Sequence, residues 1–567
     1  MLFKDINKCQ MRNPNYVYDE ACLDILNGIN DTVKVVGQYS ECHQCDFQDL
    51  TTVGPLQNTS ILVNTRYPLQ LYYVIESTKQ CSVSKLMYEH YRYGWNLTQH
   101  KCPPIYIKEP ADSAYLPILT AFIVLFCFGT LWYMVKCIYK NSGRLRSLIT
   151  WNTDIENDLG GSSAGTPLVI ERTPSIRKHP HRIKSIDVFR GFCIIVMIFV
   201  NYGGGRYWFF SHSVWNGITV ADLVFPWFMW LMGLSFTISL QSKLRRAVPR
   251  RQLVISVMRR SFVLILLGII INSNQNLQTI GSLRFPGVLQ RFGITYFVVG
   301  ILEIVFTKRG EVENVSLIHD VVVAWPQWLF VISLVIIHTC VTFLADVPGC
   351  GRGYLGPGGL DEGGKHYNCT GGVAGYIDRQ IFGEHMYKNS ACKKLYETNV
   401  YFDPEGILGT LTAILTVYFG VQAGRTLNTY QDVKAKTVRW VAWGLITTLI
   451  GGALCEFKQN DGLIPLNKQL WSLSFALVLS GMAFVVQAFL FVLVDILRKW
   501  GGRPFFYPGM NSLVLYVGHE LFKDTFPFAW TPTSETHGAY LFMNLWGTAV
   551  WVAIAIFLYK RNVFFAL

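Results

Sequence analysis

The stretch 'GFCIIVMIFVNYGGGRYWFFSH' (residues 191–212) joins an apolar run to an amide, three consecutive glycines, several aromatic rings and a histidine. It continues at residues 213–236 as 'SVWNGITVADLVFPWFMWLMGLSF', a second apolar run that contains one carboxylate, Asp222. A hydrocarbon layer about 30 Å thick is crossed by roughly 20 mostly apolar residues. Two membrane spans joined by a polar connection are therefore expected here. The side of the membrane on which the connection lies follows from the rest of the chain.

The composition of the whole chain is that of a membrane protein. Of its 567 residues, 51% are hydrophobic and only 15% are charged, and the mean hydropathy is positive; ordinary soluble folds lack this combination. Together these features predict an α-helical polytopic membrane protein with about eleven transmembrane helices. Their centres lie near residues 127, 196, 229, 267, 296, 335, 414, 446, 483, 514 and 549.

The distribution of lysine and arginine predicts the orientation. Basic residues gather after the first and third spans and after each later odd-numbered span, whereas the intervening connections hold few. Because short basic connections stay in the cytosol, the N-terminus is predicted to be luminal and the C-terminus cytosolic. The net charge of +13 is then mostly a topological signal, and no nucleic-acid partner is expected.

Cysteines and glycosylation sequons favour the same orientation. Nine of the 14 cysteines fall on the predicted luminal side, where an oxidising compartment allows disulfides. Cys42 and Cys45 also have the spacing of half a zinc site, but no second such pair follows, so a disulfide is favoured. N-x-S/T sequons on this side predict N-glycosylation at Asn30, Asn58, Asn96 and Asn368.

The chain divides by composition into four parts. Residues 1–113 predict a small, β-rich luminal domain with disulfides, and residues 114–139 the first transmembrane helix. Residues 140–185 have the low hydrophobicity of a cytosolic linker. Residues 186–567 form the transmembrane bundle, with a luminal loop at 346–404. The luminal head lacks an apolar leader in 'MLFKDINKCQ', so either a signal peptide is missing or the first span carries the head across.

Ionisable groups beside apolar sequence are the first candidates for function, because they are costly inside a membrane. Asn201 and His212 lie at the predicted luminal end of the second span, and Asp222 in the first turns of the third. A histidine next to a carboxylate is held in one tautomer and can act as a base near neutral pH. The alternative is structural: a loop histidine at headgroup level, and a carboxylate favoured by the helix dipole.

Three arginines near the cytosolic ends of spans form a second candidate group. Arg190 begins the second span, and Arg259 and Arg260 begin the fourth. Positive-inside anchoring explains them, but arginine also matches phosphate oxygens, so a phosphate-rich cytosolic ligand is the sharper alternative.

Arg291, His519 and Glu520 are further polar candidates within apolar sequence. Arg291 is too deep to reach the interface comfortably, which predicts a buried partner or an anionic ligand. Glu520 is the proposed partner, and the group has either a substrate-binding or a structural role.

Several long blocks resemble the heparan-alpha-glucosaminide N-acetyltransferase family, the transmembrane acetyltransferases of the lysosome. The resemblance runs over residues 183–567 and is carried by 'SIDVFRGFCIIVMIFVNYGGGRYWFFSHSVWNGITVADLVFPWF', 'FPGVLQRFGITYF', 'GYLGPGGLDEGGKHYNCTGGVAGYIDR', 'FDPEGILGT', 'IPLNKQLWSLS' and 'FFYPGMNSLVLYVGHE'. It implies transfer of acetyl from cytosolic acetyl-CoA to the amine of a terminal non-reducing α-glucosamine of heparan sulfate in the lysosomal lumen. It also implies a homodimer in the lysosomal membrane, with no metal.

The resemblance also assigns residues. The active-site histidine of the family falls on His212, its neighbouring asparagine on Asn201, and its carboxylate on Asp222. Arg260 is the first candidate for a phosphate of the coenzyme, with Arg190 and Arg259 behind it.

Two mechanisms remain open at this level. His212 either removes a proton from the amine during direct transfer or carries the acetyl group covalently. Two other functions also remain: a polytopic transporter of a small sugar or anion, and an acyltransferase with another acceptor. The sequence lacks a convincing internal repeat, which counts weakly against a transporter.

Overall fold

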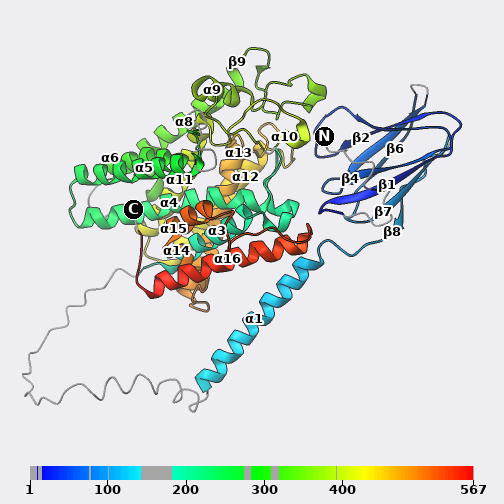
Figure 1. Cartoon of the computed structure of the whole chain (residues 1–567). Coiled ribbons are helices and arrows are strands. Elements are labelled where there is room, and N and C mark those ends of the chain that lie inside the picture. The colour runs from blue at the N-terminus through cyan, green and yellow to red at the C-terminus, as the bar shows by residue number, and fades with distance from the viewer. Residues whose placement is uncertain are drawn as a thin grey trace, which may run out of the picture. The chain divides into compact units, whose positions relative to one another are not determined.

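The computed structural model describes residues 9, 16–75, 78–99, 101–141, 182–273, 283–307, 318–390 and 392–565. The chain forms two compact units, one of Met1–Ala111 with Ile183–Leu567 and one of Asp112–Arg182. Strands make up the N-terminal part of the first unit and helices most of its remainder (Figure 1). The predicted fold class is therefore confirmed. Most of the predicted linker 140–185 lies outside the described residues.

The N-terminal domain consists of two four-stranded sheets with the strand orders β4-β1-β7-β8 and β3-β2-β5-β6. β1 pairs with β4 in the antiparallel sense and with β7 in the parallel sense. Alternate residues of β5 are buried, as expected for a strand with one face on a core. The strands are β1 Glu20–Asn27, β2 Val33–Tyr39, β3 Gln48–Val53, β4 Asn58–Asn64, β5 Leu69–Ile75, β6 Thr78–Lys85, β7 Arg92–Leu97 and β8 Tyr106–Glu109.

Disulfides hold this domain and the long loop. Three bridges lie in the N-terminal domain, Cys9–Cys22, Cys42–Cys45 and Cys81–Cys102, and the fourth joins Cys350 to Cys369. Cys42 and Cys45 form a disulfide, as favoured from the sequence, and not half of a zinc site. Cys392, the ninth cysteine of the predicted luminal set, is a buried free thiol.

The helices follow the apolar runs. The second compact unit contains α1, Leu116–Asn141, whose side chains are largely exposed, as expected for a helix surrounded by lipid. The long helices of the first unit are α3 Lys184–Asn201, α4 Val220–Arg245, α5 Arg250–Ser273, α6 Val288–Phe306, α8 Trp325–Leu344, α11 Ile407–Thr429, α12 Val433–Leu454, α13 Leu473–Leu490 and α16 His537–Lys560. The shorter ones are α7 His319–Val322, α9 Gly372–Phe382, α10 Lys393–Tyr396, α14 Phe506–Met510 and α15 Ser512–Leu521.

Within the described residues, nine helices are long and apolar enough to cross a membrane, so the predicted count of about eleven is not confirmed. The centres near residues 196 and 514 fall on α3 and α15. α3 has three charged residues in its first two turns, and α15 has only ten residues. The chain is broken between α14 and α15 where α14 packs tightly on α3: a Cβ added at Gly509 would lie 1.8 Å from the carbonyl oxygen of Asp187.

α4 and α11 cross at the centre of the bundle. A Cβ at Gly233 of α4 would lie 2.0 Å from the Val417 carbonyl oxygen, and one at Gly420 of α11 would lie 1.8 Å from that of Trp230. Only glycine allows the two backbones to approach this closely. The rigid crossing fixes the position of α4, whose first turn carries Asp222.

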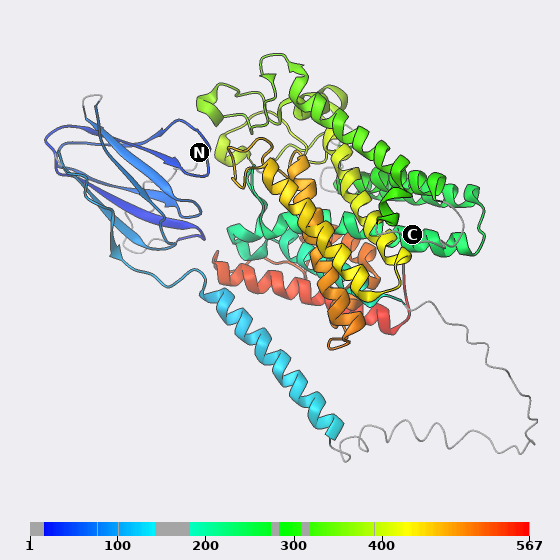
Figure 2. The same ribbon diagram turned by 180° about the vertical axis from the view of Figure 1, so that it is seen from behind.

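The N-terminal domain packs against two segments that surround the candidate site. Trp215, in the connection between α3 and α4, lies in the same apolar cluster as Trp95 of β7 and Tyr396 of α10. The indole of Trp215 donates to the Leu355 carbonyl at 2.9 Å, and Tyr396 donates to the Glu41 carbonyl at 3.1 Å. Figure 2 shows the long loop with α9 and α10 above the ends of the helices, near the strands.

Candidate active site

The connection between α3 and α4 starts with a sharp change of direction at the three glycines. Gly203, Gly204 and Gly205 have φ values of 114°, 57° and 67°. These lie in the left-handed region, and a Cβ at Gly204 would lie 2.4 Å from the Cβ of Phe210. The glycines therefore let the chain leave α3 and return toward the start of α4.

His212 and Asp222 meet at the end of this connection, as their proximity in the sequence suggested. His212 Nδ1 lies 2.8 Å from Asp222 Oδ1. The carboxylate is fully buried, whereas the imidazole keeps 40% of its side-chain surface exposed. This contact assigns the ring proton to Nδ1, so Nε2 is the nitrogen that can accept a proton.

Asp222 also caps α4. Its Oδ2 accepts the backbone N–H groups of Ser213 and Thr219, both at 3.1 Å, and the Thr219 hydroxyl at 3.0 Å. Thr219 and Asp222 form a capping box, so the structural reading of Asp222 is also true. The same bonds fix the carboxylate that orients His212.

Lys468 completes the group and was not predicted. Its Nζ lies 2.9 Å from His212 Nδ1, 3.2 Å from His212 Nε2 and 3.5 Å from Asp222 Oδ1. Only 11% of its side chain is exposed. A signal was present in the sequence, because Lys468 is a basic residue close to an apolar span on the side where lysine and arginine are rare.

Asn201 belongs to a different group. Its amide nitrogen lies 2.8 Å from Glu520 Oε1 and 2.9 Å from His519 Nε2, and His519 Nδ1 bonds the Leu515 carbonyl at 3.0 Å. Among the described residues no hydrogen bond joins Asn201 to His212. Both amide hydrogens of Asn201 are used within this group, so the described contacts leave neither for a carbonyl held at His212.

Arg291 is buried, as predicted, but the proposed partner was wrong. Its Nη2 donates to the Gly406 carbonyl at 3.0 Å, and its guanidinium lies 5.0 Å from the centre of a Trp471 ring. The carboxylates nearest in sequence to Gly406, Asp403 and Glu405, are already paired with Arg284. Glu520 bonds Asn201 instead, because α15 places it at the end of α3.

A cationic cavity of about 430 Å³ runs between α3, α4, α5 and α6. Arg190 and Arg260, two of the three predicted arginines, line it together with Lys243. The guanidinium of Arg260 lies 4.7 Å from the Tyr296 ring centre, and Arg190 donates to the Ser235 hydroxyl at 2.6 Å. Arg259 is exposed and does not line the cavity.

The cavity leads toward the His212–Asp222 pair. Lys243 and Asp222 are at opposite ends of α4, about 31 Å apart along the helix axis. The lining reaches Phe228 on α4, which leaves about 9 Å of helix to Asp222, and Met197 on α3, which leaves about 6 Å to Asn201. Tyr516 also lines the cavity, and its ring centre lies 5.3 Å from that of His519.

Comparison with known proteins identifies the family. Residues 182–348 match the family model described as heparan-alpha-glucosaminide N-acetyltransferase, catalytic. The curated heparan-alpha-glucosaminide N-acetyltransferase of Mus musculus is 40% identical over 98% of this chain and 90% of its own length. That of Homo sapiens is 40% identical over 99% of this chain and 90% of its own length. The chain belongs to the heparan-alpha-glucosaminide N-acetyltransferase family.

The region matched by the family model contains only part of the site. It includes Asn201, His212 and Asp222 and the cavity arginines, but it ends at residue 348. Lys468 and Glu520 lie beyond it, and the fold brings them back to the ends of α3 and α4. In this member of the heparan-alpha-glucosaminide N-acetyltransferase family, the site is therefore assembled from segments more than 250 residues apart in sequence.

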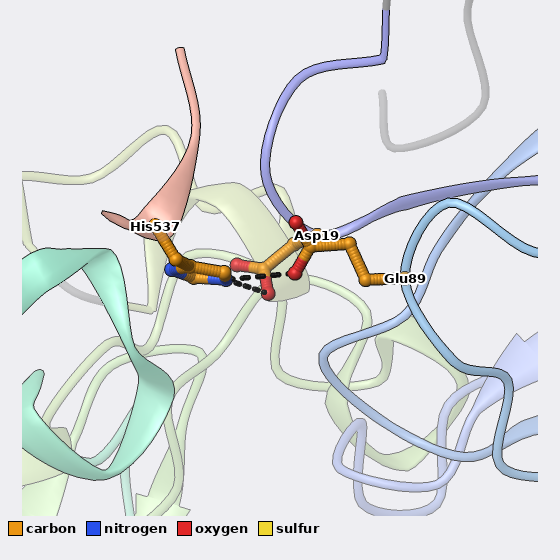
Figure 3. Close-up of side chains that lie close together, drawn as sticks. All are labelled: Asp19, Glu89 and His537. Atoms are coloured by element: carbon orange, nitrogen blue, oxygen red, sulfur yellow. Dashed lines mark ion pairs between the residues drawn. The ribbon is translucent and has the colours of Figure 1, made fainter. Parts of the chain in front are cut away.

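His537, the first residue of α16, fastens the glycine-containing connection to the N-terminal domain. Its Nδ1 lies 2.8 Å from the Gly205 carbonyl oxygen, and its ring stacks on Tyr207 at 4.1 Å between centres. Its Nε2 faces two carboxylates of the strand domain, Glu89 at 2.9 Å and Asp19 at 3.4 Å (Figure 3). These contacts join α16, the glycine-containing connection and the N-terminal strand domain to one another.

Asp19, Glu89 and His537 offer two carboxylates and an imidazole, the types of side chain that bind metal ions, and their ligand atoms lie within 4.8 Å of one another. A protonated His537 whose Nε2–H faces both carboxylates explains the short distances to Glu89 and Asp19 without a metal ion. The predicted absence of a metal stays a prediction.

Proposed function

We propose that this chain transfers the acetyl group of acetyl-CoA to the amine of the terminal non-reducing α-glucosamine of heparan sulfate, across the membrane that its helices span. The observation that carries the proposal is the cationic cavity that follows α3 and α4 toward the His212–Asp222 pair. One helix length separates a phosphate-binding end from a base, as transfer between two compartments requires. The family supplies the reaction class, and the names of its relatives supply the acceptor.

The residues along the cavity suit the two ends of acetyl-CoA. Arg190, Lys243 and Arg260 provide three cationic groups for phosphate oxygens. Within the described chain, Arg260 Nε is buried without a hydrogen-bond partner, so it is available to a ligand. Phe228 and Met232 give the inner part apolar walls that suit the uncharged arm of the coenzyme.

His212 is the proposed base. Asp222 keeps the proton on Nδ1. Nε2, which lies 3.2 Å from the Lys468 ammonium, accepts a proton from the ammonium group of the sugar when Lys468 turns to the acyl oxygen. A C–N bond then replaces the C–S bond of the thioester. The sugar ammonium loses two protons in the reaction. His212 accepts one of them and passes it to the departing sulfur, and the other passes to solvent.

Lys468 is the proposed donor to the acyl oxygen. Its ammonium lies 2.9 and 3.2 Å from the two ring nitrogens of His212, so it lies beside any acyl group that this base can serve. A fixed cation at this point stabilises the negative charge that develops on that oxygen. Asn201, with its amide committed to Glu520 and His519, is proposed to hold these two side chains at the end of α3 instead.

Direct transfer is preferred to an acetyl-histidine. A base reached from both sides needs no second conformation of the protein. Single-turnover labelling with radioactive acetyl-CoA and no sugar separates the two mechanisms, because stable label on His212 would contradict direct transfer.

The lysosomal membrane, with the N-terminus luminal and the C-terminus cytosolic, is the proposed location and orientation. The four disulfides support this orientation, because every bridged cysteine belongs to a segment predicted to be luminal. The N-terminal domain, its helix, the linker and the bundle keep their predicted boundaries in this proposal. A homodimer and glycosylation at the four sequons stay predictions; Asn30, Asn58 and Asn368 are exposed and Asn96 is half-buried.

The variant His212→Ala tests the function. N-acetylation of a glucosamine acceptor, followed by mass spectrometry, should be lost, while glycosylation and sorting of the protein are unchanged. Retained activity would remove His212 from the mechanism. Sugar that crosses vesicles of the wild-type protein without being modified would favour the transporter alternative.

A further inference from the structure

A second cleft, of about 520 Å³, lies beside the reacting group and has no part in the mechanism above. Three parts of the chain form its walls: His43 of the strand domain, residues 350–366 of the long loop, and residues 460–465 before α13. Asn216, from the connection between α3 and α4, also lines it, as do Phe343 of α8 and Tyr396 of α10. The cleft is therefore built on the same connection that carries His212.

Asn216 links the cleft to the reacting group. It follows His212 by four residues, and its Oδ1 accepts from Asn467 at 3.0 Å. Asn467 precedes Lys468, whose ammonium lies 2.9 Å from His212 Nδ1. The cleft and the reacting group are therefore joined through the hydrogen bond between Asn216 and Asn467.

The charges of the cleft favour an anionic ligand. Arg352 and Lys365 line it and are exposed, and within the described chain neither has an ion-pair partner. Each of the two carboxylates of the lining has a polar neighbour, although Asp361 Oδ1 makes no hydrogen bond among the described residues. Asp361 accepts from Tyr354 at 2.8 Å and lies 3.8 Å from His43, and Glu362 lies 3.6 Å from His366.

Burial raises the pKa of Asp361, against a smaller lowering effect of the Tyr354 hydroxyl. A raised pKa favours the neutral carboxyl in an acidic compartment, which weakens its repulsion of an anion. The two unpaired cations then dominate the electrostatic field of the cleft.

The walls are fixed before any ligand binds. Tyr396 donates to the Glu41 carbonyl and accepts from the His43 backbone, both at 3.1 Å. His43 also pairs with Asp461 at 2.9 Å. The free-energy cost of ordering side chains on binding therefore falls mainly on the exposed Arg352 and Lys365 and not on these walls. The amides of Asn216 and Asn460 add hydrogen-bonding groups of the kind that suit sugar hydroxyls.

We propose that this cleft binds the sulfated sugar units that follow the terminal glucosamine, with Arg352 and Lys365 contacting their anionic groups. The inference rests on the proposed function. It assigns to the strand domain and the long loop the selection of a sulfated chain over a free sugar.

The test compares three acceptors with the full-length protein in lipid nanodiscs at saturating acetyl-CoA. They are a simple α-glucosaminide, a glucosamine-terminated tetrasaccharide with sulfate on its internal units, and the same tetrasaccharide without sulfate. The double variant Arg352→Gln/Lys365→Gln should raise KM about tenfold for the sulfated tetrasaccharide, as expected for two exposed charge contacts. The rise should be less than twofold for the other two acceptors.

A matched variant, Lys393→Gln/Lys394→Gln, removes the same charge from exposed positions of the same loop outside the cleft, and it should leave all three KM values within twofold. Added salt should raise KM for the sulfated acceptor more strongly in the wild type than in the cleft variant. An equal rise for all acceptors, or no rise for any, would overturn the subsite. A wild type that acetylates none of the acceptors would instead contradict the proposed function.

Discussion

Replacing Asp222 with asparagine tests the arrangement of the site with almost no change in volume. Asp222 accepts four hydrogen bonds, three on Oδ2 and one on Oδ1. Asparagine has one acceptor oxygen, and leaving it on the Oδ2 side keeps the three bonds that cap α4. The amide NH₂ then faces His212 Nδ1 and forces the ring proton onto Nε2.

In that tautomer, the nitrogen that should accept the substrate proton already carries one. We expect kcat to fall about a thousandfold, which corresponds to ~4 kcal/mol in the transition state. The assay is acetylation of an α-glucosaminide at saturating acetyl-CoA, with binding of the coenzyme measured separately and expected to stay within a few-fold. A kcat within threefold of the wild type, in folded protein, would refute the role of Asp222 in setting the tautomer.

A control is needed because Asp222 also caps a helix. Asp495 caps α3 in a similar way, accepting the backbone N–H groups of Lys184 and Ser185 at 2.9 and 3.0 Å, and it is not part of the site. Asp495→Asn should lower the melting temperature by a few degrees and leave kcat unchanged. A comparable loss of kcat in both variants would show that helix capping alone explains the effect.

Three further predictions concern other parts of the molecule. Lys468→Met should lower kcat about a hundredfold, since it removes the proposed donor to the acyl oxygen, and Lys468→Arg should restore part of the loss; equal rates for all three proteins would exclude that role. Arg260→Gln should raise KM for acetyl-CoA about tenfold with little change in KM for the sugar, whereas the exposed Arg251→Gln should change neither; an effect on the sugar alone would contradict the assignment. Burial raises the pKa of Asp378 to about 6, from a value near 3.8 in the unfolded chain, so its ionisation opposes folding, and stability should fall as pH rises from about 4 to about 6. Asp378→Asn should flatten thermal unfolding across that range by up to a few kcal/mol, and an unchanged pH profile would show that another group is responsible.

The sequence predicted the fold class because apolar runs and basic connections directly reflect a membrane. Two of the predicted spans, near residues 196 and 514, fall on α3 and α15, which are not among the nine helices of the described residues that are long and apolar enough to cross a membrane. α3 starts with three charged residues, of which Asp187 is buried, and α14 and α15 form a broken helix that packs on α3. Apolar composition alone could not give the length of these helices. Disulfide pairing could not be read from the sequence either, since it depends on which strands are neighbours.

The candidate site was predicted in part for a similar reason. His212 and Asp222 are ten residues apart, and the capping of α4 brings them together locally. Lys468 was missed because it is 256 residues from His212 and only the tertiary fold places it there. Glu520 was predicted to be the partner of Arg291, but it bonds Asn201 because of the packing of α15.

The measurement that tests the central claim most directly is a sided reaction in sealed vesicles. Protein of one known orientation is reconstituted with α-glucosaminide enclosed on the side of His212 and radioactive acetyl-CoA supplied only on the side of Arg260. We predict N-acetylated sugar inside, no labelled coenzyme inside, and no product with His212→Ala. Acetyl-CoA found inside the vesicles, or product formed only when both substrates share one side, would contradict transfer across the membrane at this site.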